Sequence, residues 1–243
     1  MRNAGTVAGR RGSVEREKTG TAERIVTTLI GWIDRRQLSH AATLHEATLL
    51  KFYSASILLT AFEAAHHAEE HPHAAIGTIL LATAGAEAFI HELAAHIDRC
   101  NKARDWTPDA ITPSLIAAAH AIAEPHGLID KYVAAAAALG KPFDAGSRVL
   151  KDARRLVGLQ QCIVGCGLEH RAETLTDELA TRDIAKARHP EQLPWFRRLQ
   201  TPATATWASR GACALILATL DLMPRKAIEP MSAVQALYQG LQT

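Results

Sequence analysis

Residues 150–167 read LKDARRLVGLQQCIVGCG, a stretch that is cationic at its start and apolar thereafter. Residues 76–97, IGTILLATAGAEAFIHELAAHI, form a second apolar stretch. Apolar positions in it recur every three or four residues, which places them in one seam along a helix. The seam consists of Ile76, Ile79, Thr83, Ala86, Ile90, Leu93 and Ile97. We therefore expect the two stretches to form partner helices at the centre of the protein.

The composition favours helices throughout. The chain of 243 residues is long enough to bury a sizeable core. Hydrophobic residues make up 48% of it, mostly Ala, Leu and Ile, and aromatic residues only 5%. Strong helix formers thus outweigh β-branched and aromatic residues, which predicts an all-α helical bundle. The net charge of +2 is too small to indicate a nucleic-acid-binding protein, but it leaves room for a local basic face.

The order of segments along the chain suggests one domain behind a tail. Residues 1–20 are rich in Gly, Arg and Ser, and we expect a disordered tail there. Residues 21–243 are expected to form a single all-helical domain with additional short helices. Residues 190–202 read as a loop. The predicted helices span residues 21–36, 39–71, 73–101, 112–140 (two short helices hinged at Pro125-His126-Gly127), 147–167, 174–188 and 201–223, followed by a short tail helix.

Polar residues ahead of the apolar runs mark the starts of three predicted helices. Ser147, Thr174 and Thr201 can each accept a hydrogen bond from the first turn of the helix that follows. Pro202 also suits the first helical position, where its missing N–H costs nothing.

Small residues form a stripe on the helix predicted for residues 147–167. Gly158, Cys162 and Gly165 recur at helical spacing, and glycine within a helix costs about 1 kcal/mol relative to alanine. One interpretation is that another helix approaches closely at this stripe, which would favour a homodimer. The other is that Gly165 and Gly167 end the helix.

Several patterns that could bind metal have simpler explanations. The cluster of His66, His67, His71 and His73 reads as the polar end of a helix. Cys162 and Cys166 lie four residues apart but lack a second pair of ligands, so we predict no metal site and no cofactor. The sequence begins without an apolar signal segment and contains no uninterrupted apolar run of about 18 residues, so we predict a cytoplasmic protein that does not cross a membrane.

Four segments together resemble one family. Residues 87–93, EAFIHEL, resemble the E-A-F-I-N-E-L helix of HEPN-superfamily proteins. Residues 141–146, KPFDAG, and 156–165, LVGLQQCIVG, are similar to the family's loop and second helix, which normally reads L-x-x-L-R-N-x-I-V-H. Residues 201–207, TPATATW, resemble the closing helix of one HEPN-like subfamily. The resemblance spans roughly residues 45–223 in the right order.

The resemblance implies an RNA-directed protein whose catalytic motif is absent at its expected place. HEPN proteins are all-helical, usually dimeric, and common in bacterial toxin–antitoxin and phage-defence systems. The arginine and histidine of their R-x4–6-H motif act on the RNA backbone without metal, and two chains usually pool their motifs. Here the motif-equivalent positions hold Gln160, Gln161 and Gly165, which supply neither positive charge nor proton transfer. His170-Arg171 is the best-placed displaced pair.

The sequence therefore leads to three functional hypotheses. The first is a catalytically silent HEPN-like protein that acts by RNA or partner binding and by dimerisation. The second is a divergent metal-independent endoribonuclease that uses His91, His170 or Arg171. The third is a helical protein-interaction module without an RNA role. Whether the chain is an enzyme stays open, and a non-enzyme is the favoured reading.

Two further expectations concern charged residues. Arg148, Arg154 and Arg155 form the expected RNA-binding group, because they gather at the start of one helix. Glu87 is expected to be buried, to face the helix of Gln160, and to pair with an amide or an arginine, because a buried carboxylate without a partner is costly.

Overall fold

The computed structural model describes residues 53–102, 113–124, 126–165, 167–188, 193–224, 227 and 232–242. All of them belong to one unit that spans residues 47–243, distinct from a unit of residues 1–46. The predicted tail 1–20, the predicted helix 21–36 and the first part of the predicted helix 39–71 lie outside the described residues.

Within the described residues every regular element is a helix, which confirms the all-α prediction. The helices are α3 (Tyr53–His67), α4 (Ala74–Lys102), α5 (Pro113–Ala123), α6 (Leu128–Ala138), α7 (Arg148–Val164), α8 (Glu169–Ala180), α9 (Trp195–Arg198), α10 (Pro202–Leu222) and α12 (Ser232–Gly240).

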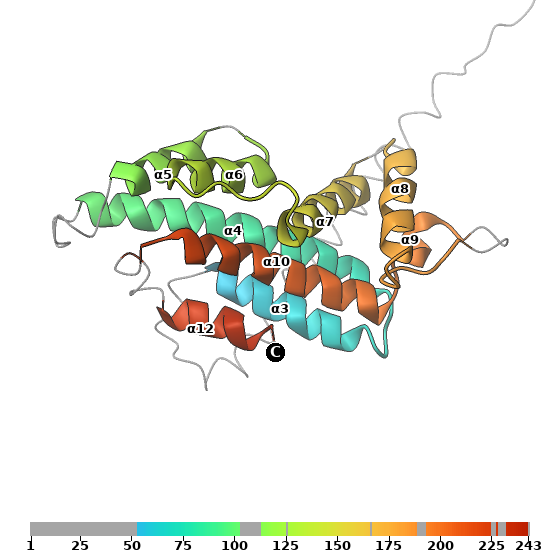
Figure 1. Cartoon of the computed structure of the whole chain (residues 1–243). Coiled ribbons are helices and arrows are strands. Elements are labelled where there is room, and N and C mark those ends of the chain that lie inside the picture. Colours follow the sequence, from blue (N-terminus) through green and yellow to red (C-terminus); the bar gives the residue numbers. More distant parts are fainter. Residues whose placement is uncertain are drawn as a thin grey trace, which may run out of the picture. The chain divides into compact units, whose positions relative to one another are not determined.

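The centre of this unit is formed by α3, α4 and α10, which run alongside one another (Figure 1). Leu58, Phe89 and Ile216 are fully buried between them. α3 and α4 approach so closely at Gly85 that an added Cβ would lie 2.6 Å from Leu58 Cγ, so the contact depends on glycine. Of the seven seam positions predicted on α4, all except the half-buried Ile76 are buried.

Two short helices, α5 and α6, cover the C-terminal half of α4 (Figure 1), as the hinge at residues 125–127 predicted. Gly127 stands at the N-cap of α6. Tyr132 on α6 is fully buried, and its hydroxyl donates a hydrogen bond of 2.7 Å to the carbonyl of Ala86 on α4. This buried contact joins the pair of short helices to the central layer.

Two of the three predicted caps are confirmed. Ser147 Oγ accepts a hydrogen bond from the N–H of Leu150 at 3.3 Å at the start of α7. Thr201 Oγ1 accepts one from the N–H of Thr204 at 3.0 Å, and Pro202 opens α10.

The predicted helix 174–188 and its Thr174 cap are wrong. α8 begins at Glu169, and Thr174 lies inside it with its hydroxyl bonded to the carbonyl of His170 at 3.0 Å. The helix ends at Ala180 because Asp183 adopts a left-handed φ of 56°. The carbonyl of Ile184 then accepts the Thr201 hydroxyl at 2.7 Å, which holds the turn against the start of α10.

The predicted loop 190–202 contains a helical turn instead. α9 follows Pro194, whose carbonyl accepts the N–H of Arg197 at 2.9 Å. A proline ahead of the first residue fixes the backbone for such a turn. Four residues are too few for a hydrophobic period, so the sequence pattern could not reveal it.

α4 is also long and apolar enough to cross a membrane by length and composition. In the structure, 56% of its most apolar window is buried inside the protein, as in a core helix. The absence of a membrane span stays a prediction.

Candidate functional site

The candidate site lies on a hairpin formed by α7 and α8, where the motif-equivalent residues are found. α8 runs antiparallel to α7. Residues with lower numbers on α7 therefore pair with residues of higher number on α8 and just after it. Four successive pairs line the interface. From the connection outward they are Gln161 with Arg171, Gly158 with Leu175, Arg155 with Glu178, and Asp152 with the Arg182 that follows α8.

At the motif-equivalent positions the structure places an amide beside a guanidinium. Gln160 is half-buried, whereas Gln161 and Gly165 are exposed. Arg171 Nη1 donates a hydrogen bond of 3.2 Å to Gln161 Oε1. Gly165 is the C-cap of α7, and a Cβ there would lie 2.7 Å from the Gln161 carbonyl oxygen. A histidine at position 165 would therefore disturb the helix end.

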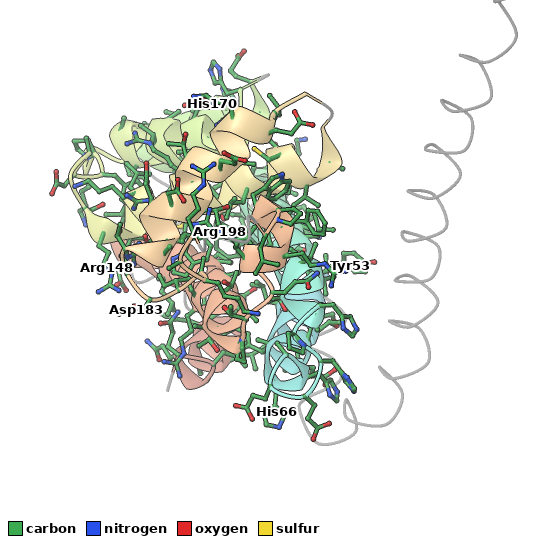
Figure 2. The ribbon with its side chains drawn as sticks, turned by 90° about the vertical axis from the view of Figure 1, so that its right-hand side faces the viewer. Tyr53, His66, Arg148, His170, Asp183 and Arg198 are labelled. Atoms are coloured by element: carbon green, nitrogen blue, oxygen red, sulfur yellow. The ribbon has the colours of Figure 1, made fainter. Side chains whose placement is uncertain are left out.

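The displaced pair predicted at His170-Arg171 is only half assembled. Both side chains are exposed, and only Arg171 contacts a motif-equivalent residue among the described residues. Adjacent residues on a helix point about 100° apart. His170 is therefore turned away from the Arg171 guanidinium, toward solvent at the end of α8 (Figure 2).

The small-residue stripe is explained within one chain. An added Cβ on Gly158 would lie 2.9 Å from Leu175 Cδ1 and 3.4 Å from Arg171 Nη2, so glycine allows α8 to approach. Cys162 is buried, and burial raises the pKa of its thiol against the opposing charge of Arg171. Close helix approach is thus confirmed at Gly158, but its partner belongs to the same chain, and Gly165 ends the helix.

The expectation for Glu87 is wrong, since its side chain is exposed. It makes no hydrogen bond or ion pair with another described residue. Its neighbours Ala86 and Ile90 form the buried side of α4, which leaves Glu87 on the outer side. His91 is exposed too, with Nε2 3.1 Å from Lys131 Nζ on α6. Neither contacts a motif-equivalent residue in the described part of the chain.

The partly buried acid of α4 is Glu92, which the sequence did not single out. Its carboxylate accepts hydrogen bonds from the N–H of Ser54 at 3.0 Å and from Ser54 Oγ at 2.6 Å. Ser54 Oγ also lies 3.0 Å from the hydroxyl of Tyr238 on α12. The partners stand 38 and 184 positions apart in the chain, so no local spacing could identify them.

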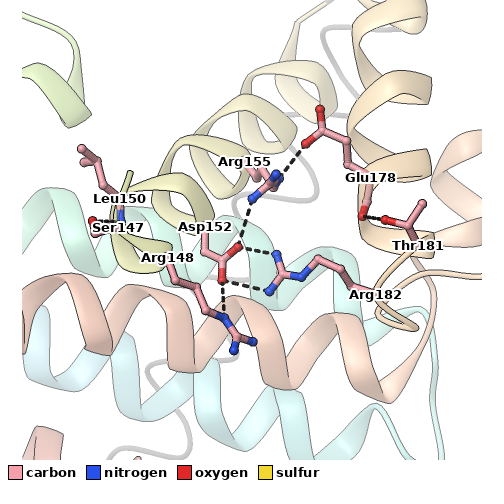
Figure 3. A network of polar contacts seen from close by, with 8 residues as sticks. All are labelled: Ser147, Arg148, Leu150, Asp152, Arg155, Glu178, Thr181 and Arg182. Carbon is pink, nitrogen blue, oxygen red and sulfur yellow. Dashed lines mark hydrogen bonds and ion pairs between the residues drawn. The ribbon is translucent and has the colours of Figure 1, made fainter. Parts of the chain in front are cut away.

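A second missed acid, Asp152, contacts two of the three arginines predicted to bind RNA, Arg148 and Arg155 (Figure 3). It is 7% exposed, and its two oxygens accept hydrogen bonds of 2.5 and 3.0 Å from Arg182. Arg155 Nη1 lies 3.4 Å away and Arg148 Nε 3.6 Å away. Arg155 Nε also pairs with Glu178 at 2.6 Å. Arg155 is therefore held inside the hairpin, whereas Arg148 stays 84% exposed.

The electrostatics of Asp152 favour its charged form. Burial alone would raise its pKa, but the hydrogen bond and charge of Arg182, with Trp207 and Arg148, hold the pKa below its ordinary value. The same contact raises the pKa of Arg182. The buried Trp207 Nε1 also lowers the pKa of Asp152. It forms no hydrogen bond of regular geometry, so we assign it a minor contribution to that pKa.

A further ion pair holds α9 to α8. Arg198 has a side chain 3% exposed, and it donates to Asp177 Oδ1 at 2.6 Å and to the Lys186 carbonyl at 2.9 Å. Figure 2 shows Arg198, the last residue of α9, beside α8. The double arginine at 197–198 was its only local signal in the sequence.

Other sites lie elsewhere or outside the described residues. In the described part no three His, Cys, Asp or Glu side chains gather as metal ligands, and Cys166 is not described. A pocket of about 300 Å³ opens between α4 and α5, lined by Asp98, Asn101 and His120 among apolar residues. α5 lies toward the opposite end of α4 from the α7–α8 hairpin (Figure 1).

The hairpin can bind an anion but lacks an assembled acid–base pair. Arg171 offers a guanidinium that is not neutralised by an acid, and Arg154 is exposed without an acid partner among the described residues. Gln161 can donate or accept hydrogen bonds but transfers no proton. Comparisons of the chain with protein-family models, with curated proteins and with solved structures give no match.

Proposed function

We propose that the protein is a catalytically silent, HEPN-like RNA-binding protein whose α7–α8 hairpin holds backbone phosphates. The observation that carries the proposal is the Arg171–Gln161 contact of 3.2 Å. An arginine bonded to a neutral amide keeps its full charge and free N–H donors. Guanidinium groups bind phosphate through paired hydrogen bonds.

Further cations extend this surface along α7. Lys151 and Arg154 are exposed, and they share a helical stripe with Gly158 and Gln161. Neither has an acid partner in the described part of the chain. Arg171 lies against Gly158 from the other helix, so cations flank the hairpin interface from both sides. Of the arginines predicted to bind RNA, Arg154 and Arg148 suit this role, and Arg155 does not.

The residues at the motif-equivalent positions support the absence of RNA cleavage. Metal-free cleavage of RNA needs a group that moves protons near neutral pH, usually histidine. Gly165 has no side chain, and Gln160 and Gln161 do not titrate. Such a protein would suit the toxin–antitoxin or phage-defence context that the resemblance implies, as a binder of RNA or of a partner.

The divergent ribonuclease is a second candidate, and the position of Arg171 favours it. Its guanidinium reaches the helix end where the family carries catalytic residues, and His170 stands next to it in sequence. A small rotation of α8 in an RNA complex could bring the imidazole closer to a bound phosphate.

RNA binding and RNA cleavage measured on one preparation in EDTA test the proposal. The wild type should bind single-stranded RNA and leave it intact. Arg171→Gln should weaken binding tenfold or more, since a charged hydrogen bond contributes roughly 1.5–3 kcal/mol. Arg99→Gln is the matched control, because Arg99 is also exposed but lies near the far end of α4. Cleavage in EDTA that His170→Ala abolishes would replace this proposal with the ribonuclease.

A further inference from the structure

α9 presents two aromatic rings and a guanidinium at the surface. Phe196 is 41% exposed, and the Trp195 ring meets it edge to face at 6.1 Å between centroids. Arg197 Cζ lies 5.9 Å from the centroid of the Phe196 ring, within the range of a cation–π contact. Leu193, 44% exposed, precedes this group.

This helical turn is held firmly although it is short. Its Arg198 is fixed to Asp177 and to the Lys186 carbonyl, and its own carbonyl accepts the Lys186 N–H at 2.9 Å. Arg198 points inward, and Phe196 stands two positions before it, about 200° around the helix, so the Phe196 ring points to the opposite, outer side. The rigid backbone therefore presents Phe196 and Arg197 in fixed positions, and no described segment covers the Phe196 ring.

The charged side chains around α9 indicate what kind of partner could bind there. Asp177 is paired with Arg198, and Glu173 with Arg188 at 3.2 Å. Arg197 and Lys186 are exposed and have no acid partner among the described residues. The surface beside the rings is thus positively charged, which opposes a basic partner and suits a polyanion with flat apolar groups.

We infer that Phe196 and Arg197 form a stacking platform for unpaired bases of single-stranded RNA. Exposed aromatic rings and arginine planes stack on bases that are not paired, while nearby cations follow the phosphates. α9 packs on α8, the helix that also carries Arg171. This inference rests on the proposed RNA binding and adds to it a preference for single strands.

Fluorescence anisotropy with oligouridylate, oligoadenylate and a fully paired RNA duplex of the same length tests the platform. Phe196→Ala should weaken binding of both single strands by about fivefold or more, the effect of losing one stacked base, and should leave duplex binding unchanged. Phe196→Tyr should keep wild-type binding, because a tyrosine ring also stacks. Arg197→Gln should weaken binding of both single strands, because it removes the charged plane that stacks beside the Phe196 ring.

Two controls separate this inference from the proposed function. Tyr53→Ala removes an aromatic ring that is 66% exposed on α3, and it should leave RNA binding unchanged. If the wild type binds RNA and Phe196→Ala binds single strands equally well, the platform is wrong while RNA binding stands. Loss of self-association in Phe196→Ala with unchanged RNA binding would assign the patch to a protein contact and overturn the inference. Failure of the wild type to bind any RNA would overturn both.

Discussion

At the residue scale, acids in long-range contacts are the features that local patterns miss. Glu87 stands beside a recognisable seam, which predicts a buried side chain, yet it is exposed. Asp152 and Glu92 occupy the positions that need partners, and those partners are Arg182, Ser54 and, through Ser54, Tyr238. The helical period of apolar residues predicts which side of a helix is buried. It does not predict which side chain from a distant part of the sequence will bind there.

Asp152 carries the first prediction. Asp152→Asn should lower the free energy of unfolding at pH 7 by about 3 kcal/mol or more, because it leaves Arg182 and its neighbours without their carboxylate. Urea denaturation measures this change. Asp98→Asn is the control, since Asp98 forms an exposed pair with Lys102 and should change stability by about 0.5 kcal/mol or less. Equal effects of the two substitutions would contradict the prediction.

The shifted pKa of Asp152 also predicts how the free energy of unfolding changes at low pH. The pKa of Asp152 is lower in the folded protein than its ordinary value of about 3.9. Its stabilising effect is therefore complete above about pH 4 and is lost as the pH falls toward the folded-state pKa. Urea denaturation between pH 5 and the acid transition should show a smaller loss of stability in Asp152→Asn than in the wild type.

At the scale of elements, long seams and caps could be predicted, and contacts between helices could not. The bounds of α4 and the starts of α7 and α10 agree with the patterns in the sequence. α8 was misplaced because its end depends on the left-handed Asp183 and on hydrogen bonds from Thr201 and Thr204 to the Ile184 carbonyl. Those bonds exist only after α10 has packed nearby.

Gly158 tests the contact between α7 and α8. Gly158→Leu should lower the free energy of unfolding by about 1–3 kcal/mol, because the larger side chain must displace Leu175. Leu175→Ala should relieve part of that loss, which a double-mutant cycle would measure. Gly211→Ala is the control within a helix, since an added Cβ there meets nothing within 4 Å, and it should stabilise by up to about 1 kcal/mol. Additive effects of Gly158→Leu and Leu175→Ala would count against the packing described here.

At the scale of the whole molecule, the helical class followed from composition, whereas the assembly of the chain did not. The packing of α12 on α3 and α10 joins the last described segment to the first one. Ser54 and Tyr238 form this junction from 184 positions apart. Dimerisation stays a prediction, and the glycine stripe no longer supports it, because α8 of the same chain occupies that stripe. Light scattering at micromolar concentration would decide it.

Two buried tyrosines predict how the molecule responds to alkali. Tyr132 and Tyr238 are fully buried, and burial raises the pKa of each hydroxyl well above its ordinary value of about 10. Their stabilising effect is therefore complete below about pH 10 and is lost as the pH rises toward the folded-state pKa values. Above pH 10, stability should fall by about 1.4 kcal/mol per pH unit for each buried tyrosine.

Tyr238→Phe isolates one of the two contributions. At pH 7 it should cost about 1 kcal/mol, for the hydrogen bond with Ser54, while the ring keeps its edge-to-face contact with Phe89 at 6.0 Å. Above pH 10 the stability of Tyr238→Phe should fall more slowly than that of the wild type, because phenylalanine has no proton to lose. The two slopes should differ by about 1.4 kcal/mol per pH unit. Urea denaturation at a series of alkaline pH values measures both effects, with the exposed Tyr53→Phe as the control. Parallel alkaline limbs in Tyr238→Phe and the wild type would mean that Tyr238 is not buried in the folded protein, and that α12 does not pack on α3 as described.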